Sequence, residues 1–306
     1  MDGALLPVAN AFHAGAYDKT IGMASMMQTQ TSTLSEQQRL LGQCYLLHAQ
    51  LAIHEHQKVK DVTATATEGP LRALFLLSQY LSNQLDGAQR GRVLQEARAF
   101  AEKLPSSASM LALTARSKAI IADIFMSEGL LEECMRLVAP HVHVDMECAG
   151  ALFRCYTRIH RLDLCANLLM ELKKMAEDAS LTLQCEASLY LKQGAAKIQD
   201  AFYVYQELLE TYGSNLKLLN NQAVALMSMH EFAKAEKLLS EAYQLNQKDP
   251  VTLAHLMVCA RQLRRPMENV NMFKQGLFEN GPRHPVVLET DLKSSLFDRL
   301  VQKFAA

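Results

Sequence analysis

The fold is decided by residues 180–250, which read SLTLQCEASLYLKQGAAKIQDAFYVYQELLETYGSNLKLLNNQAVALMSMHEFAKAEKLLSEAYQLNQKDP. One pattern of two apolar triplets occurs twice in this stretch. The first triplet recurs after 36 residues and the second after 34. The spacing between the two triplets therefore differs by two residues, which a turn between them would absorb. The four triplets are Leu183, Ala187 and Tyr190; Ala201, Tyr205 and Leu208; Leu219, Ala223 and Leu226; and Ala235, Leu239 and Ala242.

The spacing within each triplet predicts helices. Residues three and four apart lie on one face of an α-helix, so each copy is a pair of short amphipathic helices. The small residue in each helix allows its neighbour to approach closely. A repeat near 34 residues with small residues at these places is typical of tetratricopeptide repeats (TPRs). Because one such hairpin cannot bury its apolar face alone, the pair predicts further copies.

Traces of those copies occur along the whole chain. Leu41 and Gly42, followed by Tyr45, match the L-G-x-x-Y pattern of the first TPR helix. The small-residue position of the second helix recurs at spacings of 31, 36 and 34 residues, at Cys134, Cys165, Ala201 and Ala235. The thiols of Cys134 and Cys165 are therefore expected to pack between helices.

These observations predict an all-α fold, a right-handed TPR-like α-solenoid of helical hairpins that forms one domain over residues 1–306. Residues 284–306 are expected to form a C-terminal helix that caps the open core of the last repeat. Its apolar side would consist of Leu296, Phe297, Leu300, Val301 and Phe304.

Composition excludes several classes of protein. With 49% hydrophobic and 21% charged residues, the 306-residue chain has material for a large core. A net charge of −1 does not favour general nucleic-acid binding. Seven scattered cysteines without a CxxC motif favour reduced thiols over a disulfide framework or a zinc ribbon. Neither a signal peptide nor a membrane span is expected, since the longest uncharged apolar stretch, Leu40 to Ile53, is short.

Candidate chemical sites are weak. His54 and His56 are two residues apart, whereas the HExxH zinc motif needs four. The stretch from His141 to Cys148 could present His141, His143 and Asp145 on one side of an extended segment and bind a metal, but an exposed connector after Pro140 is the preferred interpretation.

No phosphate loop, nucleophile elbow or paired-acid motif occurs in the sequence, so we expect no catalysis and no cofactor. A thiol or metal enzyme remains as a rival hypothesis. The basic cluster of Arg261, Arg264 and Arg265 is compatible with a solvated helix end or with an anionic partner.

Several stretches resemble the epsilon subunit family of coatomer. The resemblance is densest after Arg161 and loose between Gln28 and Ser106. It rests on Asn10 to Phe12, Gly15 to Tyr17, Arg161 to Ala166 (RLDLCA), Glu171 to Met175 (ELKKM), Gln199 to Tyr203 (QDAFY), Leu218 to Ala223 (LLNNQA), and the terminal His284-Pro285 with Phe297 to Val301 (FDRLV).

This resemblance implies a non-catalytic, all-helical TPR spiral in the heptameric COPI coat, which serves Golgi-to-ER and intra-Golgi transport. It implies the C-terminal domain of the alpha subunit as direct partner, with other coatomer subunits contacted indirectly. It also implies a cytoplasmic location on Golgi membranes and coated vesicles, reached through the coat alone.

First-helix positions of a solenoid line its concave surface, so these residues are the expected partner groove. They are Arg116, Asp123, Arg154, Thr157, Gln184, Ser188, Asn220, Val224 and Met227.

A TPR adaptor or co-chaperone scaffold is the alternative function. It would use Lys and Asn side chains to clamp the terminal carboxylate of a peptide. The corresponding positions form a poor clamp, since they hold Ala119, Asp123, Gly150, Arg154, Gln184, Ser188, Asn220 and Val224.

Overall fold

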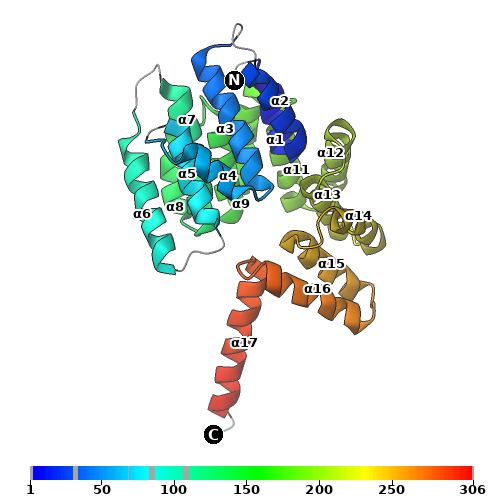
Figure 1. Cartoon of the computed structure of the whole chain (residues 1–306). Coiled ribbons are helices and arrows are strands. Elements are labelled where there is room, and N and C mark those ends of the chain that lie inside the picture. Colours follow the sequence, from blue (N-terminus) through cyan, green and yellow to red (C-terminus); the bar gives the residue numbers. More distant parts are fainter. Residues whose placement is uncertain (1–2, 30–33, 68, 83–86, 106–109, 305–306) are drawn as a thin grey trace. The chain divides into compact units, whose positions relative to one another are not determined.

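The computed structural model describes residues 3–29, 34–67, 69–82, 87–105 and 110–304. Within these ranges the chain is helical and contains no strand (Figure 1). The all-α prediction is therefore confirmed. The helices divide into two compact units, Met1–Lys192 and Gln193–Ala306. The expectation of a single continuous domain stays a prediction.

In the described residues of the first unit, eleven α-helices follow one another, with the 3-10 turn Ala139–His141 between α8 and α9. The helices are α1 Leu6–Ala14, α2 Tyr17–Thr29, α3 Glu36–Ala52, α4 His56–Thr63, α5 Gly69–Leu81, α6 Gly87–Lys103, α7 Leu111–Ser127, α8 Leu131–Val138, α9 Met146–Arg158, α10 Leu162–Ala176 and α11 Ser180–Gln193.

The second unit continues the pattern of paired helices, with α13 packed on α14 and α15 packed on α16. Its helices are α12 Lys197–Tyr212, α13 Leu216–Ser228, α14 Phe232–Leu245, α15 Pro250–Gln262, α16 Met267–Asn280 and α17 Pro285–Phe304.

Local sequence explains where several helices begin. Ser35 caps α3: its hydroxyl accepts from the backbone N–H of Gln38 at 3.2 Å, and the Gln38 side chain accepts from the backbone N–H of Ser35 at 2.8 Å. The carboxylates of Asp145 and Asp249 cap α9 and α15 in a similar way. These caps satisfy N–H groups that have no partner within the helix.

The small side chains lie where the pattern predicted. Cys134, Cys165, Ala201 and Ala235 are all fully buried. At Gly150 on α9 the approach is closer still, because a Cβ there would lie 3.1 Å from the Leu181 side chain. Close contact between helices thus depends on small residues at repeated positions.

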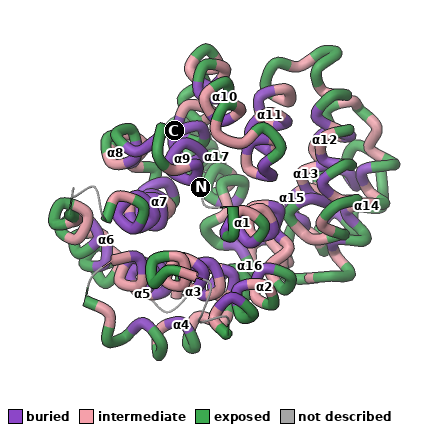
Figure 2. Tube along the Cα trace, turned by 90° about the horizontal axis from the view of Figure 1, so that it is seen from above, coloured by how far each residue is buried: buried purple, intermediate pink, exposed green. Residues whose placement is uncertain are grey.

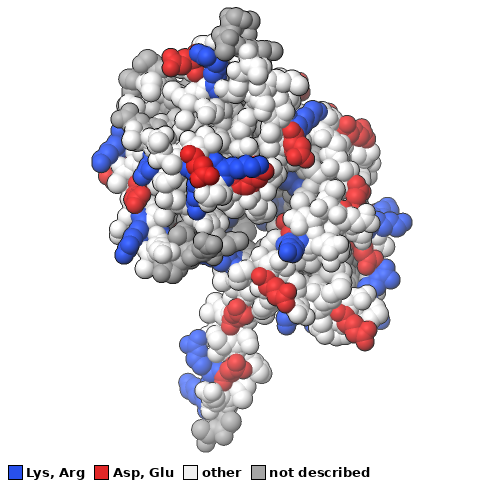
Figure 3. Space-filling model, viewed as in Figure 1, with Lys and Arg blue, Asp and Glu red and all other residues white. Residues whose placement is uncertain are grey.

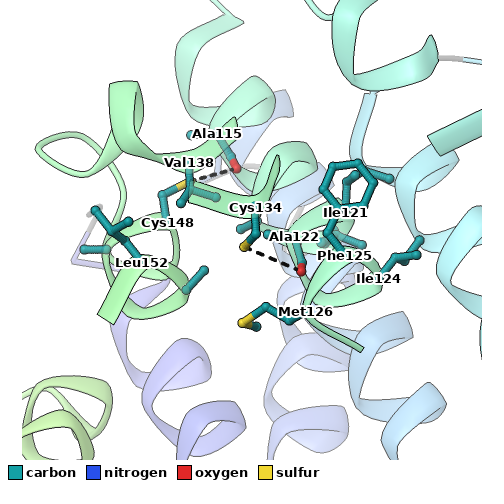
Figure 4. Packing of buried hydrophobic residues seen from close by; sticks show 14 of the residues in the cluster. Ala115, Ile121, Ala122, Ile124, Phe125, Met126, Cys134, Val138, Cys148 and Leu152 are labelled. Atoms are coloured by element: carbon teal, nitrogen blue, oxygen red, sulfur yellow. Dashed lines mark hydrogen bonds between the residues drawn. The ribbon is translucent and has the colours of Figure 1, made fainter. Parts of the chain in front are cut away.

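Helix α7 lies at the centre of the first unit, where it packs against α5, α8 and α9. Ile120, Ile121 and Ile124 are fully buried on it. Two thiols from neighbouring helices donate to its carbonyl groups, Cys148 to Ala115 at 3.3 Å and Cys134 to Ala122 at 3.8 Å (Figure 4). Each buried isoleucine contributes roughly 1.5–3 kcal/mol to folding.

The C-terminal helix forms as expected, and its first turn covers part of the core of the last repeat. Val287 in the first turn is buried against Leu253, Ala254 and Leu277. Figure 1 shows α17 extending from α16 beyond that first turn. The five side chains that were expected to cover the core are exposed: Leu296, Phe297, Leu300, Val301 and Phe304.

Replacing Ala235 by Leu should destabilise the second unit. The added atoms have no space between packed helices, and such overpacking typically costs about 1–3 kcal/mol. Ala233→Leu is the matched control, because Ala233 is exposed on the same helix and its substitution should change stability by less than about 0.5 kcal/mol. Urea unfolding measures both; equal midpoints for the two variants would show that Ala235 does not control the packing.

Candidate functional site

The inner surface of the first unit holds the N-terminal helix of the same chain. Helix α1 lies among α3, α7, α9 and α11 (Figure 2). Its Phe12 ring packs against the rings of Tyr45 and His48 on α3, with centroids 5.6 and 4.7 Å apart. Gly15 ends α1 in the left-handed region, at φ 86°, and its N–H bonds back to the helix. The helix that follows, α2, packs directly on α3.

Polar contacts attach α1 to α11, about 170 residues further along the chain. The Asn10 side-chain oxygen accepts from the Ser180 backbone N–H at 3.1 Å, and the Ser180 hydroxyl donates to the Asn10 carbonyl at 2.7 Å. The Gln184 amide donates to the His13 carbonyl at 2.8 Å. The first helix of the unit, α1, is therefore bonded directly to the last one, α11.

A buried ion pair lies beneath α1. Arg116 on α7 pairs with Glu147 on α9, and their side chains are only 2% and 8% exposed. The Tyr45 hydroxyl donates to the same carboxylate at 2.5 Å, and the Nε2 atom of His13 lies 3.3 Å from it. The Arg116 guanidinium lies over the Tyr45 ring, 4.3 Å from its centroid. Four helices thus contribute to one cluster around the Glu147 carboxylate.

Burial and charge set the protonation of this cluster. Desolvation, assisted by the positive charge of Arg116, lowers the pKa of His48 from 6.5 to about 3. His48 is then neutral at physiological pH, and its Nδ1 can accept from Arg116 Nη2 at 3.2 Å. Burial raises the pKa of Tyr45 to about 12, so its hydroxyl remains a donor. Tyr45 and His48 are therefore both neutral near pH 7.

Three of the expected groove residues are buried within the chain. Arg116 and Gln184 are buried and bonded within the first unit, as described above. Asn220 in the second unit is buried too, and its amide donates to the Thr252 hydroxyl at 2.8 Å. The His255 ring nitrogen lies 3.0 Å from the Asn220 side-chain oxygen. A role for these three residues in partner binding stays a prediction.

The other six expected groove residues remain at least partly accessible. Arg154 and Asp123 form an ion pair at 2.8 Å, with side chains 55% and 28% exposed. The Thr157 hydroxyl donates to the backbone carbonyl of Phe153. Ser188, Val224 and Met227 are half-buried. A role for these six in partner binding stays a prediction.

The His141 to Cys148 stretch does not have the extended geometry considered for a metal site. His141 ends a 3-10 turn and is buried, with its Nε2 atom 2.9 Å from Lys118 Nζ. His143 is exposed, and the Asp145 carboxylate caps α9. Among the residues that the structure describes, no group of three His, Cys, Asp or Glu side chains could hold a metal ion.

The other candidate residues, His54, His56 and the arginine cluster, lie at helix ends or in ion pairs and do not form a chemical site. His56 begins α4, whereas His54 follows the end of α3. Arg265 forms a two-bond ion pair with Glu236, at 3.1 and 2.6 Å. On the face seen in Figure 3, positive and negative side chains are interspersed, without a broad area of one sign. None of the helices in the described ranges is long and apolar enough to cross a bilayer.

The paired helices and their small-residue contacts define the class of this protein, a TPR-like helical-repeat protein. A TPR solenoid among solved structures supports that class: a chain of the APC/C hetero-tetramer Cut9–Hcn1 superposes with a TM-score of 0.58 at 11% identity. The match covers 94% of this chain and 54% of the other, so this chain spans about half of that protein.

The family model "Coatomer epsilon subunit" matches residues 1–305, and the chain belongs to this family. Curated relatives include coatomer subunit epsilon-1 of Arabidopsis thaliana, 28% identical over 98% of this chain and 97% of the relative. The coatomer subunit epsilon of Dictyostelium discoideum is 27% identical over 99% of both chains. The protein is accordingly a structural coat component and not an enzyme.

Glu147→Ala should destabilise the chain strongly, because it leaves the Arg116 guanidinium buried without its counter-charge. Loss of one partner of a buried pair costs about 3–5 kcal/mol. Glu132→Ala is the control, since Glu132 pairs with Arg136 on the surface and should contribute less than about 1 kcal/mol. Urea unfolding compares them, and Glu147→Leu combined with Arg116→Met should recover part of the loss. Similar small effects at Glu147 and Glu132 would contradict a structural role for the cluster.

His48 should make the free energy of unfolding depend on pH. Its folded pKa of about 3 lies below the ordinary value of 6.5, so between these values the unfolded chain binds a proton that the folded chain does not. Stability from this residue is complete above about pH 6.5 and falls below it, by up to about 1.4 kcal/mol per pH unit. His48→Gln should therefore lose less stability than the wild type between about pH 7 and pH 5. Chemical unfolding at pH 7 and pH 5 measures the free energy of unfolding of both proteins. An equal loss in the wild type and in His48→Gln would count against a neutral buried His48.

Proposed function

We propose that the chain binds and stabilises the C-terminal domain of the coatomer alpha subunit. In this role it acts as a non-catalytic member of the COPI coat in retrograde Golgi-to-ER and intra-Golgi transport. It would work on the cytosolic face of Golgi membranes and coated vesicles, and would reach the membrane only through the coat. Membership of the coatomer epsilon family supports the proposal.

The observation that carries the proposal is the apolar face of α17. Five side chains spaced by four residues follow this helix and are all exposed: Leu288, Leu292, Leu296, Leu300 and Phe304. Phe297 and Val301 widen the row over the last two turns. Phe297 and Phe304 are 65% and 82% exposed. Soluble proteins rarely leave such a row uncovered unless a partner binds there.

The chemistry of this face suits a folded protein domain. Burying one Leu or Phe side chain contributes roughly 1.5–3 kcal/mol, so the row could supply much of a stable interface. The charges beside it balance, because Glu289, Asp291 and Asp298 offset Lys293, Arg299 and Lys303. A basic surface, which an anionic membrane or a nucleic acid would favour, is absent from this helix.

A TPR adaptor that reads a peptide terminus has less support. A peptide in the first unit would have to compete with α1, which already occupies the inner surface there. Two clamp positions cannot donate from a side chain, since they hold Ala119 and Gly150, and Gln184 donates to His13. We therefore favour binding of a folded domain over binding of a peptide terminus.

Co-purification with the alpha C-terminal domain tests the proposal. We expect a stable complex for the wild type and a higher melting temperature for the bound chain. Phe297→Glu combined with Leu300→Glu should weaken co-purification, because the interface would have to bury two carboxylates.

Asp291→Ala combined with Asp298→Ala is the matched control, because both residues lie on the opposite side of the same helix and the complex should persist. Circular dichroism confirms that each variant remains helical. A wild-type chain that does not bind the alpha domain would refute the proposed function. A complex indifferent to Phe297 and Leu300 would exclude α17 from the interface.

A further inference from the structure

Two cysteine thiols lie in direct contact within the first unit. Cys134 on α8 and Cys155 on α9 are fully buried, and their sulfur atoms are 3.3 Å apart. The two helices belong to consecutive hairpins and pack against each other. A disulfide needs an S–S distance of about 2.0 Å, so a shift of little more than about 1 Å would bring the sulfurs to bonding distance.

The hydrogen bonds around this pair form a chain. The Cys155 thiol donates to the Cys134 sulfur, and the Cys134 thiol donates to the Ala122 carbonyl at 3.8 Å (Figure 4 shows the second bond). Other buried thiols of the unit have different partners. Cys148 donates to the Ala115 carbonyl at 3.3 Å, and the Cys165 sulfur lies 3.6 Å from the Thr157 hydroxyl.

The surroundings distinguish the two thiols. When Cys155 ionises, the remaining S–H of Cys134 can donate to the thiolate, and the charges of Arg154 and Arg158 also favour it. These interactions lower the pKa of Cys155, and the same coupling raises the pKa of Cys134. Arg158 is held in place because its guanidinium donates to the Met126 carbonyl at 2.6 Å. A pair with one activated thiol is the arrangement found in reactive dithiols.

We propose that Cys134 and Cys155 form a reversible dithiol–disulfide pair whose oxidant is a small-molecule disulfide. The Cys155 thiolate attacks one sulfur of the oxidant RSSR, forms a mixed disulfide and releases RS⁻. The Cys134 thiol then loses its proton to a released thiolate and attacks the Cys155 sulfur, which releases the second RS⁻. In total the protein loses two hydrogen atoms, and RSSR becomes two molecules of RSH.

Access to the pair requires a local opening, since neither sulfur contacts solvent. Helix α8 is the element suited to open, because it spans only eight residues and continues into a 3-10 turn. Oxidation should therefore be slow and limited by this motion. Once formed, the bond would join α8 covalently to α9 and prevent the same opening.

Oxidation of the folded full-length chain with oxidised glutathione tests the inference. Mass spectrometry of the wild type should show the loss of two hydrogen atoms and a cross-linked peptide that contains Cys134 and Cys155. Reduction with excess thiol should reverse the change. Cys148→Ser is the matched control for another buried thiol on α9, and it should form the same cross-link.

Single substitutions test the order of the steps. Cys134→Ser should retain glutathione on Cys155 as a trapped mixed disulfide, whereas Cys155→Ser should leave Cys134 unmodified. Circular dichroism checks that both variants fold. If either variant does not fold, the cross-linked peptide of the oxidised wild type decides whether Cys134 and Cys155 form the disulfide. The inference is overturned if the cross-link is missing from the oxidised wild type, joins other cysteines, or forms only in unfolded protein.

Discussion

The structure of the first unit depends on the ion pair between Arg116 and Glu147. It joins α7 to α9, and through Tyr45 and His13 it also holds α3 and α1. Such a pair contributes to stability only when further contacts compensate the burial of its charges. Here a phenol, an imidazole and the face of an aromatic ring surround it, and the Arg116 Nε atom has no hydrogen-bond partner among the described residues. The contact of His13 with Glu147 adds to the bonds that α1 makes with α11, and α1 in turn covers part of the inner surface of the unit.

The sequence predicts the hairpins because their cause is local. Small residues at repeated positions set the distance between neighbouring helices, and Cys134, Cys165, Ala201 and Ala235 are buried as this rule requires. The position of α1 could not be predicted in the same way. Its contacts with Ser180 and Gln184 join residues about 170 positions apart, and no periodic pattern encodes such a pairing. The apolar row on α17 was visible in the sequence, but the pattern could not distinguish a face that covers the last repeat from one left for another chain.

The expected groove residues illustrate the same limit. Arg116 and Gln184 do face inward, as their first-helix positions indicate, but the inner surface of the first unit already holds α1. An inward position therefore identifies a contact surface without identifying its occupant. Asn10 and His13, which make those contacts from α1, carried no signal of this role in the sequence. The accessible apolar surface of α17, in contrast, has no occupant within the described chain, and family membership suggests the other subunits of the coat as its partners.

Hydrogen exchange of the free, full-length chain at neutral pH tests most directly whether α1 is an integral part of the first unit. The account predicts that the backbone amides of α1 from Asn10 to Ala14 exchange as slowly as those of α7 and α9, because all three helices share the buried cluster. Exchange of the α1 amides at the rate of an unfolded peptide, with α7 and α9 still protected, would contradict it.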